Sequence, residues 1–416
     1  MSGWLLAQAD ARRLPLADRC VQCVVTSPPY WGLRDYGVEG QIGREPSPNA
    51  FVATMVHVFR EVWRVLRDDG VAWMNLGDSY CTIPHGPLGA NSFDAKSPIR
   101  KRREGEQANR RPLPGLKHKD LIGIPWRVAL ALQADGWYLR SDVIWDKPNP
   151  MPESVTDRPT KSHEYVFLLT KSERYFYDAE AVSEPATYAG KTVSLGPKSL
   201  SRGQAVGMGV VASGNGSAAS VVVADGRNLR SVWSIATQPY EGAHFATMPP
   251  ALAERCVKAG SSERGCCPAC RTPWMREVES ERVPTRPGVS SKVYAEPPVH
   301  PGSPMRRHAG DVCGNRDPQR HDSRKVTKGW VQACRCPAAD PVPCLILDPF
   351  NGSGTTGAVA QQLGRRYVGV DLSRSYLGMA VDRIKGALRP RSRLDAAPAI
   401  VPLAGQLSLF EEEKAS

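Results

Sequence analysis

The chain has 416 residues, of which 41% are hydrophobic and 23% are charged, an ordinary composition for a globular protein. No apolar run reaches the roughly 20 residues that a membrane-spanning helix needs. The start of the sequence lacks the basic end and apolar centre of a secretory signal, so we expect a cytoplasmic protein. The formal net charge of +12 at pH 7 favours a polyanionic partner.

Segments of strand and helix character alternate along the chain. Apolar runs at Leu5–Ala9 and Val21–Thr26 predict strands, and Phe51–Leu66 gathers its apolar residues on one face of a helix. Further strands are expected at Val71–Leu76, Tyr138–Trp145, Tyr165–Thr170, Cys344–Leu347 and Arg366–Val370, and further helices at Ile124–Ala134, Pro250–Lys258, Thr356–Leu363 and Ser375–Leu388. This alternation predicts a doubly wound α/β sheet with mostly parallel strands.

Polar segments rich in Gly, Pro and basic residues interrupt this core. The segment Arg271–Lys328 shows no periodicity, so we expect it to be irregular. The expected organisation is a first part of the core at 1–80, a basic insertion at 81–119, a continuation of the core at 120–260 with an irregular stretch at 187–226, a Cys-rich basic insertion at 261–340, a second part of the core at 341–388 and a mobile tail at 389–416.

The basic insertion contains four consecutive cationic residues, Arg100, Lys101, Arg102 and Arg103. Such a run is either a solvated loop or a set of phosphate contacts, which hold nucleic acid without reading its sequence. Charge alone leaves both interpretations open.

A candidate cofactor loop follows the apolar strand that ends at Asp348. A Gly-rich turn and a helix come next, an arrangement that lets backbone amides approach a ligand closely. The following strand ends in Asp371, where a ribose diol could be held. The turn lacks the Lys-Ser/Thr pair of a P-loop, and Asp348 would repel a phosphate. An acid suits a cationic cofactor, and S-adenosylmethionine carries both a sulfonium and an ammonium group.

A candidate reaction centre is the turn Thr26-Ser27-Pro28-Pro29-Tyr30, where a predicted strand ends. An amine attached to an aromatic ring is a poor nucleophile unless acceptors draw on its hydrogens, and Ser27 offers a hydroxyl oxygen while Pro28 offers a carbonyl. Pro28 and Pro29 restrict the backbone before a substrate binds, and Tyr30 offers a flat face on which such a ring can stack. Taken alone, this turn could be structural.

The two motifs together resemble those of DNA amino-methyltransferases, the N4-cytosine/N6-adenine DNA methylase family. Asp-Pro-Phe-Asn-Gly-Ser-Gly-Thr-Thr at 348–356 is similar to the family's cofactor motif, and Thr-Ser-Pro-Pro-Tyr at 26–30 to its catalytic motif. The catalytic motif comes first, which is the permuted order of the β class. The resemblance covers about residues 1–80, 120–260 and 340–388. It implies a Rossmann-like sheet of about seven strands, S-adenosylmethionine as cofactor, and double-stranded DNA as substrate.

The resemblance also implies roles for single residues. Ser27, Pro28, Pro29 and Tyr30 would be catalytic. Cofactor contacts would come from Asp348 at the methionine moiety, Phe350 in the adenosyl pocket, Gly352, Gly354 and Thr355 in the loop, Asp371 at the ribose, Asp10 near the adenine, and Phe245 and Pro249 in a segment that wraps the methionine end.

Less specific features of the sequence indicate the target base. Arg140–Trp145, followed by Asp146–Pro150 and Arg158, resembles a segment near the target base, and Arg158 would contact DNA. In the family Ser-Pro-Pro-Tyr occurs more often with cytosine N4, so that amine is favoured. The alternatives are adenine N6, an RNA or protein amide substrate, and an inactive zinc-containing DNA-binding protein.

Eleven cysteines in a chain expected in the cytoplasm argue against a disulfide framework. Two close pairs, Cys267 with Cys270 and Cys334 with Cys336, flank the basic insertion and match the four thiolates of a structural zinc site. The long spacing between the pairs leaves other ligands open: Cys266, Cys313, His308 and His321. The alternative is a set of reduced, solvent-exposed thiols.

The tail contains Gln406, Leu407, Ser408, Leu409 and Phe410. This pentapeptide resembles the segment that docks on the bacterial sliding clamp, where spaced leucines and an aromatic fill an apolar groove. Packing of the tail against the catalytic domain is the equally weighted alternative.

Overall fold

The computed structural model describes residues 3–81, 113, 115–185, 192–195, 219–222, 226–238, 247–284 and 321–388. The chain divides into two compact units. The first comprises Met1–Val182, Arg230–Met275 and Trp330–Ser416, and the second comprises Ser183–Leu229 and Arg276–Gly329. The catalytic and cofactor motifs both belong to the first unit.

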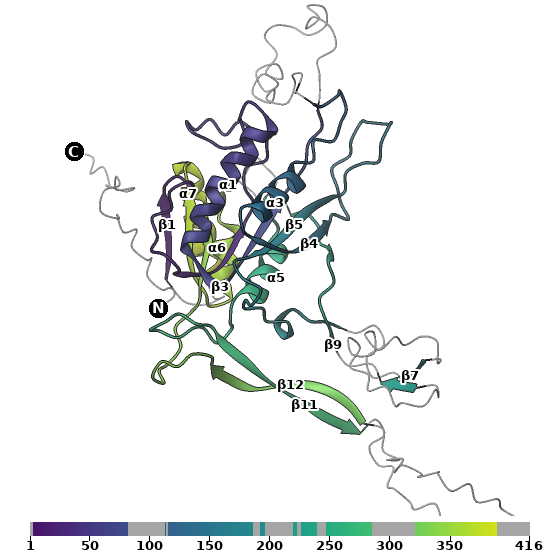
Figure 1. Ribbon diagram of the computed structural model, residues 1–416, viewed down its shortest axis with the longest axis vertical. Helices are drawn as coiled ribbons and strands as arrows, with labels where there is room; N and C mark the ends of the chain where they lie inside the picture. The colour runs from purple at the N-terminus through teal and green to yellow at the C-terminus, as the bar shows by residue number, and fades with distance from the viewer. Residues whose placement is uncertain are drawn as a thin grey trace, which may run out of the picture. The chain divides into compact units, whose positions relative to one another are not determined.

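The first unit is built on an eight-stranded sheet (Figure 1). Every neighbouring pair is parallel except the two pairs made by β5, which runs against β3 and β4. Across the sheet the strands are β1 (Trp4–Gln8), β14 (Arg366–Asp371), β13 (Leu345–Asp348), β2 (Val21–Thr26), β3 (Leu66–Leu76), β5 (His163–Thr170), β4 (Tyr138–Asp146) and β10 (Val232–Ser234). This confirms the mostly parallel, doubly wound α/β sheet that the sequence predicts.

Helices cover both faces of this sheet. The helices α1 (Pro48–Val65) and α3 (Ile124–Ala134) pack on one face, where their apolar residues meet those of β2, β3 and β5. Ser47 begins α1 by accepting a hydrogen bond from Ala50 N at 3.2 Å. The helices α5 (Pro250–Gly260), α6 (Thr355–Gln362) and α7 (Arg374–Leu388) follow one another on the opposite face.

A long hairpin occupies part of the segment that we expected to be irregular. Strands β11 (Trp274–Pro284) and β12 (His321–Gln332) pair with each other, so the prediction of an irregular Arg271–Lys328 is wrong there. The strand β11 reads Trp-Met-Arg-Glu-Val-Glu-Ser-Glu-Arg-Val-Pro. Both of its faces carry charged residues, so the sequence lacks the apolar alternation that marks a strand resting on a core.

Short strand pairs complete the described structure outside the main sheet. They are β6 (Glu184–Pro185) with β9 (Gly226–Arg227) and β7 (Thr192–Leu195) with β8 (Ala219–Val222). Among the described residues, no helix combines the length and apolar character needed to cross a membrane. Several predicted site residues lie outside the described residues: Arg100, Lys101, Arg102, Arg103, Phe245 and the tail segment Gln406–Phe410.

The sheet topology explains how the two motifs meet. The strands β14, β13, β2 and β3 are parallel neighbours, so their carboxyl ends lie on one edge of the sheet. Thr26, Asp348 and Asp371 stand at those ends. Ligands of open α/β sheets bind at this edge.

Candidate active site

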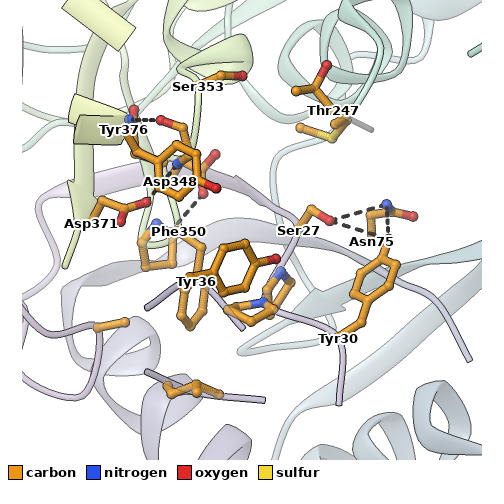
Figure 2. A pocket seen from close by; sticks show the side chains of 18 of the residues that line it. Ser27, Tyr30, Tyr36, Asn75, Thr247, Asp348, Phe350, Ser353, Asp371 and Tyr376 are labelled. Carbon is orange, nitrogen blue, oxygen red and sulfur yellow. Dashed lines mark hydrogen bonds between the residues drawn. The ribbon is translucent and has the colours of Figure 1, made fainter. Parts of the chain in front are cut away.

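A cavity of about 240 Å³ opens at the carboxyl edge of the sheet, and residues of both motifs line it. Figure 2 shows Ser27, Asn75 and Tyr30 gathered on one side and Asp371, Phe350 and Tyr376 on the other, with Tyr36 between them. Six of the predicted cofactor residues line the cavity: Asp10, Asp348, Phe350, Gly352, Thr355 and Asp371. Pro249 caps the start of α5 and Gly354 the start of α6, and neither is in the lining.

Asp348 is a buried carboxylate that joins the two motifs. Its Oδ1 accepts hydrogen bonds from Thr26 Oγ1 at 2.7 Å and from Phe350 N at 3.0 Å, and its Oδ2 accepts one from Thr356 Oγ1 at 2.9 Å. Burial raises the pKa of Asp348 to about 6, against the opposing effect of these hydrogen bonds. The ionised form therefore exists near neutral pH and can attract a cation in the cavity.

The Gly-rich turn after Asp348 is shaped by left-handed backbone and by close packing. Gly354 has a φ of 79°, and a Cβ there would come within 2.7 Å of the Ala380 side chain, so only glycine fits without a shift. Asn351 Oδ1 accepts a hydrogen bond from Tyr367 Oη at 2.8 Å. The turn is thus fixed against β14 and α7.

Asp371 closes the turn from the end of the neighbouring strand. Its carboxylate accepts hydrogen bonds from Gly352 N and from Ser373 N, each at 2.8 Å. Burial raises the pKa of Asp371, and hydrogen bonds from the backbone oppose that effect. An acceptor fixed by backbone donors is suited to a ribose diol, as the sequence predicts.

Asp10 lies in the cavity lining in an ion pair. Arg12 donates to both of its carboxylate oxygens, with Nε at 3.0 and 2.9 Å and Nη2 at 2.6 Å. Burial alone would raise the pKa of Asp10, but the hydrogen bonds from Arg12 outweigh it and lower the pKa. Asp10 is therefore an ionised acceptor in a fixed orientation.

Around Ser27 the side chains form a hydrogen-bonded network. Asn75 Nδ2 donates to Tyr30 Oη at 2.9 Å and to Glu164 Oε2 at 3.0 Å, and it lies 3.4 Å from Ser27 Oγ. Tyr30 Oη donates to the same Glu164 oxygen at 2.5 Å. Burial, together with the carboxylate of Glu164, raises the pKa of Tyr30 well above its usual value, so the hydroxyl stays protonated and keeps this bond.

Two members of this network were not predicted from the sequence. Asn75 is the next-to-last residue of β3 and Glu164 the second residue of β5, and the two strands are antiparallel neighbours. Sequence reasoning overlooked two signals. One is the carboxylate of Glu164 near the start of the apolar run His-Glu-Tyr-Val-Phe-Leu-Leu-Thr. The other is the buried amide of Asn75 in the otherwise apolar end of β3.

Lys147 pairs with Glu164 within the same cavity. Its ammonium donates to Glu164 Oε1, and the two side chains are only 18% and 14% exposed. The ammonium also lies 4.4 Å from the centre of the Trp145 ring. The chain therefore places a cation, a carboxylate and an amide beside the turn at 26–30, which the sequence predicts to be catalytic.

The Tyr30 ring rests directly on the backbone of Gly77. A Cβ at Gly77 would come within 2.5 Å of Tyr30 Cε2, so a larger residue would displace the ring. The contact and the hydroxyl bonds together set the orientation of Tyr30.

Comparisons with known proteins agree with this geometry. A family model described as DNA methylase matches residues 21–267 and 344–382. The chain belongs to this family of DNA methylases. It is 38% identical over 391 residues to the Type II methyltransferase M.Cfr9I of Citrobacter freundii, covering 93% of this chain and 89% of that protein. It is 39% identical over 370 residues to M.SmaI of Serratia marcescens, covering 89% and 86%.

The methylase is therefore an S-adenosylmethionine-dependent DNA methyltransferase of the restriction-modification type. Among solved structures, one described as the PvuII DNA methyltransferase (cytosine-N4-specific) aligns over 92% of this chain and 86% of that one, with 13% identity and a TM-score of 0.48.

The cavity fits the cofactor that the family uses. It combines the carboxylates of Asp348 and Asp371 with the aromatic rings of Phe350 and Tyr376.

The contacts that the structure gives for Arg158 are with other residues of the same chain. Its Nη1 donates to Glu153 Oε2 at 2.6 Å, and its guanidinium lies 3.9 Å from the centre of the Tyr80 ring. A contact between Arg158 and DNA stays a prediction.

The four predicted metal ligands of the methylase come together. The sulfur atoms of Cys267, Cys270, Cys334 and Cys336 all lie within 4.8 Å of one another. Cys266 does not belong to this group; its sulfur lies 3.6 Å from Gln22 Nε2.

Proposed function

We propose that this methylase transfers the methyl group to the exocyclic N4 amine of cytosine in double-stranded DNA. Two features support cytosine: Ser27 at the start of the catalytic turn, and the cation of Lys147 beside it. The observation that carries the proposal is the placement of Ser27, Asn75, Tyr30, Glu164 and Lys147 in one cavity with the cofactor loop.

The catalytic turn performs its role through acceptors and orientation. Bound S-adenosylmethionine supplies a methyl group that is electrophilic because it is attached to a sulfonium. The Ser27 hydroxyl and the Pro28 carbonyl accept the hydrogens of the base amine, which lets its nitrogen become tetrahedral and attack. A bond forms between that nitrogen and the methyl carbon as the bond to sulfur breaks, its electron pair stays on sulfur, and one amine proton leaves to solvent.

Tyr30 holds the extruded base in place for this attack. Its ring is fixed on one side by Gly77 and at its hydroxyl by Asn75 and Glu164. A base stacked on a ring that cannot rotate meets the methyl group in a restricted geometry, which contributes to the rate.

Lys147 gives a physical reason to favour cytosine over adenine. Next to its exocyclic amine, the Watson–Crick edge of cytosine carries N3 and the carbonyl O2, both acceptors, whereas adenine carries N1 and a C–H group. A buried ammonium compensates the loss of hydration of a carbonyl oxygen but not of a C–H group. A cation in the base pocket therefore suits the edge of cytosine.

The test is analysis of nucleosides from DNA of cells that express the protein. Mass spectrometry should detect N4-methylcytosine, and the Ser27→Ala variant should abolish it while still binding S-adenosylmethionine. N6-methyladenine as the sole product would refute the choice of base and leave the methyltransferase activity intact. Sequencing that detects modified bases in the same DNA would give the recognition site.

A further inference from the structure

The four clustered cysteines come from two short turns that are far apart in the chain. Cys267 and Cys270 lie in the turn that leads into β11, and Cys334 and Cys336 lie in the turn that follows β12. Their ligand atoms all lie within 4.8 Å of one another. Four sulfurs in a tetrahedron around zinc, at about 2.3 Å from the metal, lie about 3.8 Å apart.

We propose that these four cysteines bind one structural zinc ion, which joins the turn before β11 to the turn after β12 and ties both turns to the core strands β2 and β3. The set is complete, because four thiolates leave no open position for a substrate or water. Binding replaces four thiol protons, which pass to solvent, with four sulfur–metal bonds.

Both turns have the internal hydrogen bonds of preformed ligand loops. In the first, Arg271 N donates to Cys267 O and Cys267 N donates to Thr272 O, each at 2.9 Å. In the second, Gln332 Nε2 donates to Cys334 Sγ at 3.3 Å and to Cys336 O at 2.8 Å. A donor to a ligand sulfur orients that sulfur and stabilises its negative charge.

The first turn is anchored to the core by two side chains. From β3, Arg67 Nη1 donates to Cys270 O at 2.5 Å, while Asp69 holds its Nε at 2.7 Å. From β2, Gln22 Nε2 donates to Arg271 O at 3.1 Å. The guanidinium also suits the net charge of −2 that four thiolates and one Zn²⁺ would carry.

Gln22 connects the cluster to the strands that carry the site. Its Oε1 accepts a hydrogen bond from Leu345 N at 2.6 Å, at the start of β13. One side chain thus joins the cysteine turn to β2, which leads to Ser27, and to β13, which leads to Asp348. Because the cluster lies at the opposite ends of these strands from the cavity, its role is structural.

The alternatives to a zinc site are free thiols, a disulfide and an iron site, and they differ in measurable ways. The four thiols are free in the structure; a disulfide would need two sulfurs about 2.05 Å apart. A tetrahedral set of four thiolates also accommodates iron. Metal identity and thiol reactivity separate these possibilities.

The first experiment is metal analysis of the full-length protein purified without chelators. We expect about one zinc ion per chain and four thiols that react only after a mercurial has displaced the metal. Iron in place of zinc, or no stoichiometric metal with the four thiols freely reactive, would overturn the proposal.

Variants test the ligand set independently of activity. With Co²⁺ bound, the wild-type protein should show sulfur-to-cobalt charge-transfer bands. Cys336→His should keep one metal ion with weaker bands, because three thiolates and an imidazole also form a zinc site. Cys20→Ser, a half-buried cysteine outside the cluster, should leave the bands unchanged. A spectrum that Cys336→His does not alter would contradict the assignment.

Hydrogen exchange tests the anchoring role. Removing the metal should increase exchange in peptides that cover 262–275 and 330–345, while peptides from α1 and β3 stay protected. Equal exchange with and without metal would show that the ion does not hold these two turns in place. Neither readout depends on which base is methylated.

Discussion

Thr26 Oγ1 donates a 2.7 Å hydrogen bond to Asp348 Oδ1, joining residues that are 322 positions apart in the chain. Thr26 immediately precedes Ser27, the proposed acceptor of the base amine, and Asp348 begins the Gly-rich loop of the cofactor motif. Since β2 and β13 are parallel neighbours, this contact ties the turn that contains Ser27 to the loop that follows Asp348. If Ser27 accepts the base amine as proposed, the contact helps to set the distance between that amine and the methyl group.

Replacing Thr26 with valine removes this bond and keeps the shape of the side chain. A buried carboxylate then has one donor fewer, which costs about 1–3 kcal/mol. We expect a lower free energy of unfolding and about tenfold weaker S-adenosylmethionine binding, measured by urea unfolding and calorimetry. Thr54→Val is the matched control, because Thr54 Oγ1 donates only to Ala50 O within α1. Unchanged cofactor affinity in Thr26→Val would contradict the coupling.

Cofactor affinity should depend on pH through Asp348. Its pKa of about 6 lies above its usual value of 3.8 because of burial, so its ionised form appears only as pH rises through 6. The affinity for the cationic cofactor should therefore increase from pH 5 to about 7 and then level off. The Asp348→Asn variant should bind weakly with a flat profile. A wild-type affinity that does not change between pH 5 and 7 would exclude this role.

The same shift has the opposite consequence for stability without cofactor. A carboxyl whose pKa is raised by folding contributes stability that is complete below about pH 4 and is lost as pH rises through about 6. The unliganded protein should thus lose this contribution over the range in which it gains cofactor affinity. Unfolding at pH 4.5 and 7, compared with Asp348→Asn, measures it.

Substitution of Gly77 by alanine should slow catalysis without affecting the cofactor. The added Cβ would meet the Tyr30 ring at 2.5 Å, and a shift of about 1 Å in a positioning group can cost about a hundredfold in rate. Gly378→Ala, where a Cβ meets nothing within 4 Å, is the control and should retain full activity. Equal kcat values for the two variants would show that the Tyr30 position is unimportant.

The sequence alone predicts those elements whose own residues show a recognisable pattern. The strand Val21–Thr26 has the predicted bounds, because a buried parallel strand is a continuous apolar run that stops at a Pro-Pro turn. The helix α3 also has its predicted bounds. The cofactor turn is recognisable because its glycines satisfy a backbone geometry that other residues do not.

The remaining features of the site depend on contacts between distant segments, which no local sequence pattern reveals. Nothing in the sequence near Glu164 or Asn75 shows that these residues meet, because they do so only through the antiparallel pairing of β5 with β3. The edge strand Val232–Ser234 is too short to produce a period. The strand β11 carries charged residues on both faces, so it lacks the hydrophobic pattern by which sequence reasoning recognises a strand.

Lys147 provides a direct test of the choice of base. If its ammonium contacts cytosine O2, Lys147→Met should lower kcat/KM by about 10–100-fold, the cost of a lost hydrogen bond to a charged group. The single change leaves Glu164 without its buried partner, which is destabilising by itself. The Lys147→Met/Glu164→Gln double variant removes both charges and separates recognition from folding.

A cytosine analogue that lacks the 2-carbonyl oxygen completes the test of Lys147. Placed at the target position of a duplex, it should reduce kcat/KM for the wild type as much as Lys147→Met does with cytosine. Combining analogue and variant should cause no further loss, because both remove the same hydrogen bond. Fully additive losses would mean that Lys147 acts only by pairing with Glu164, which would leave Ser27 as the remaining support for cytosine.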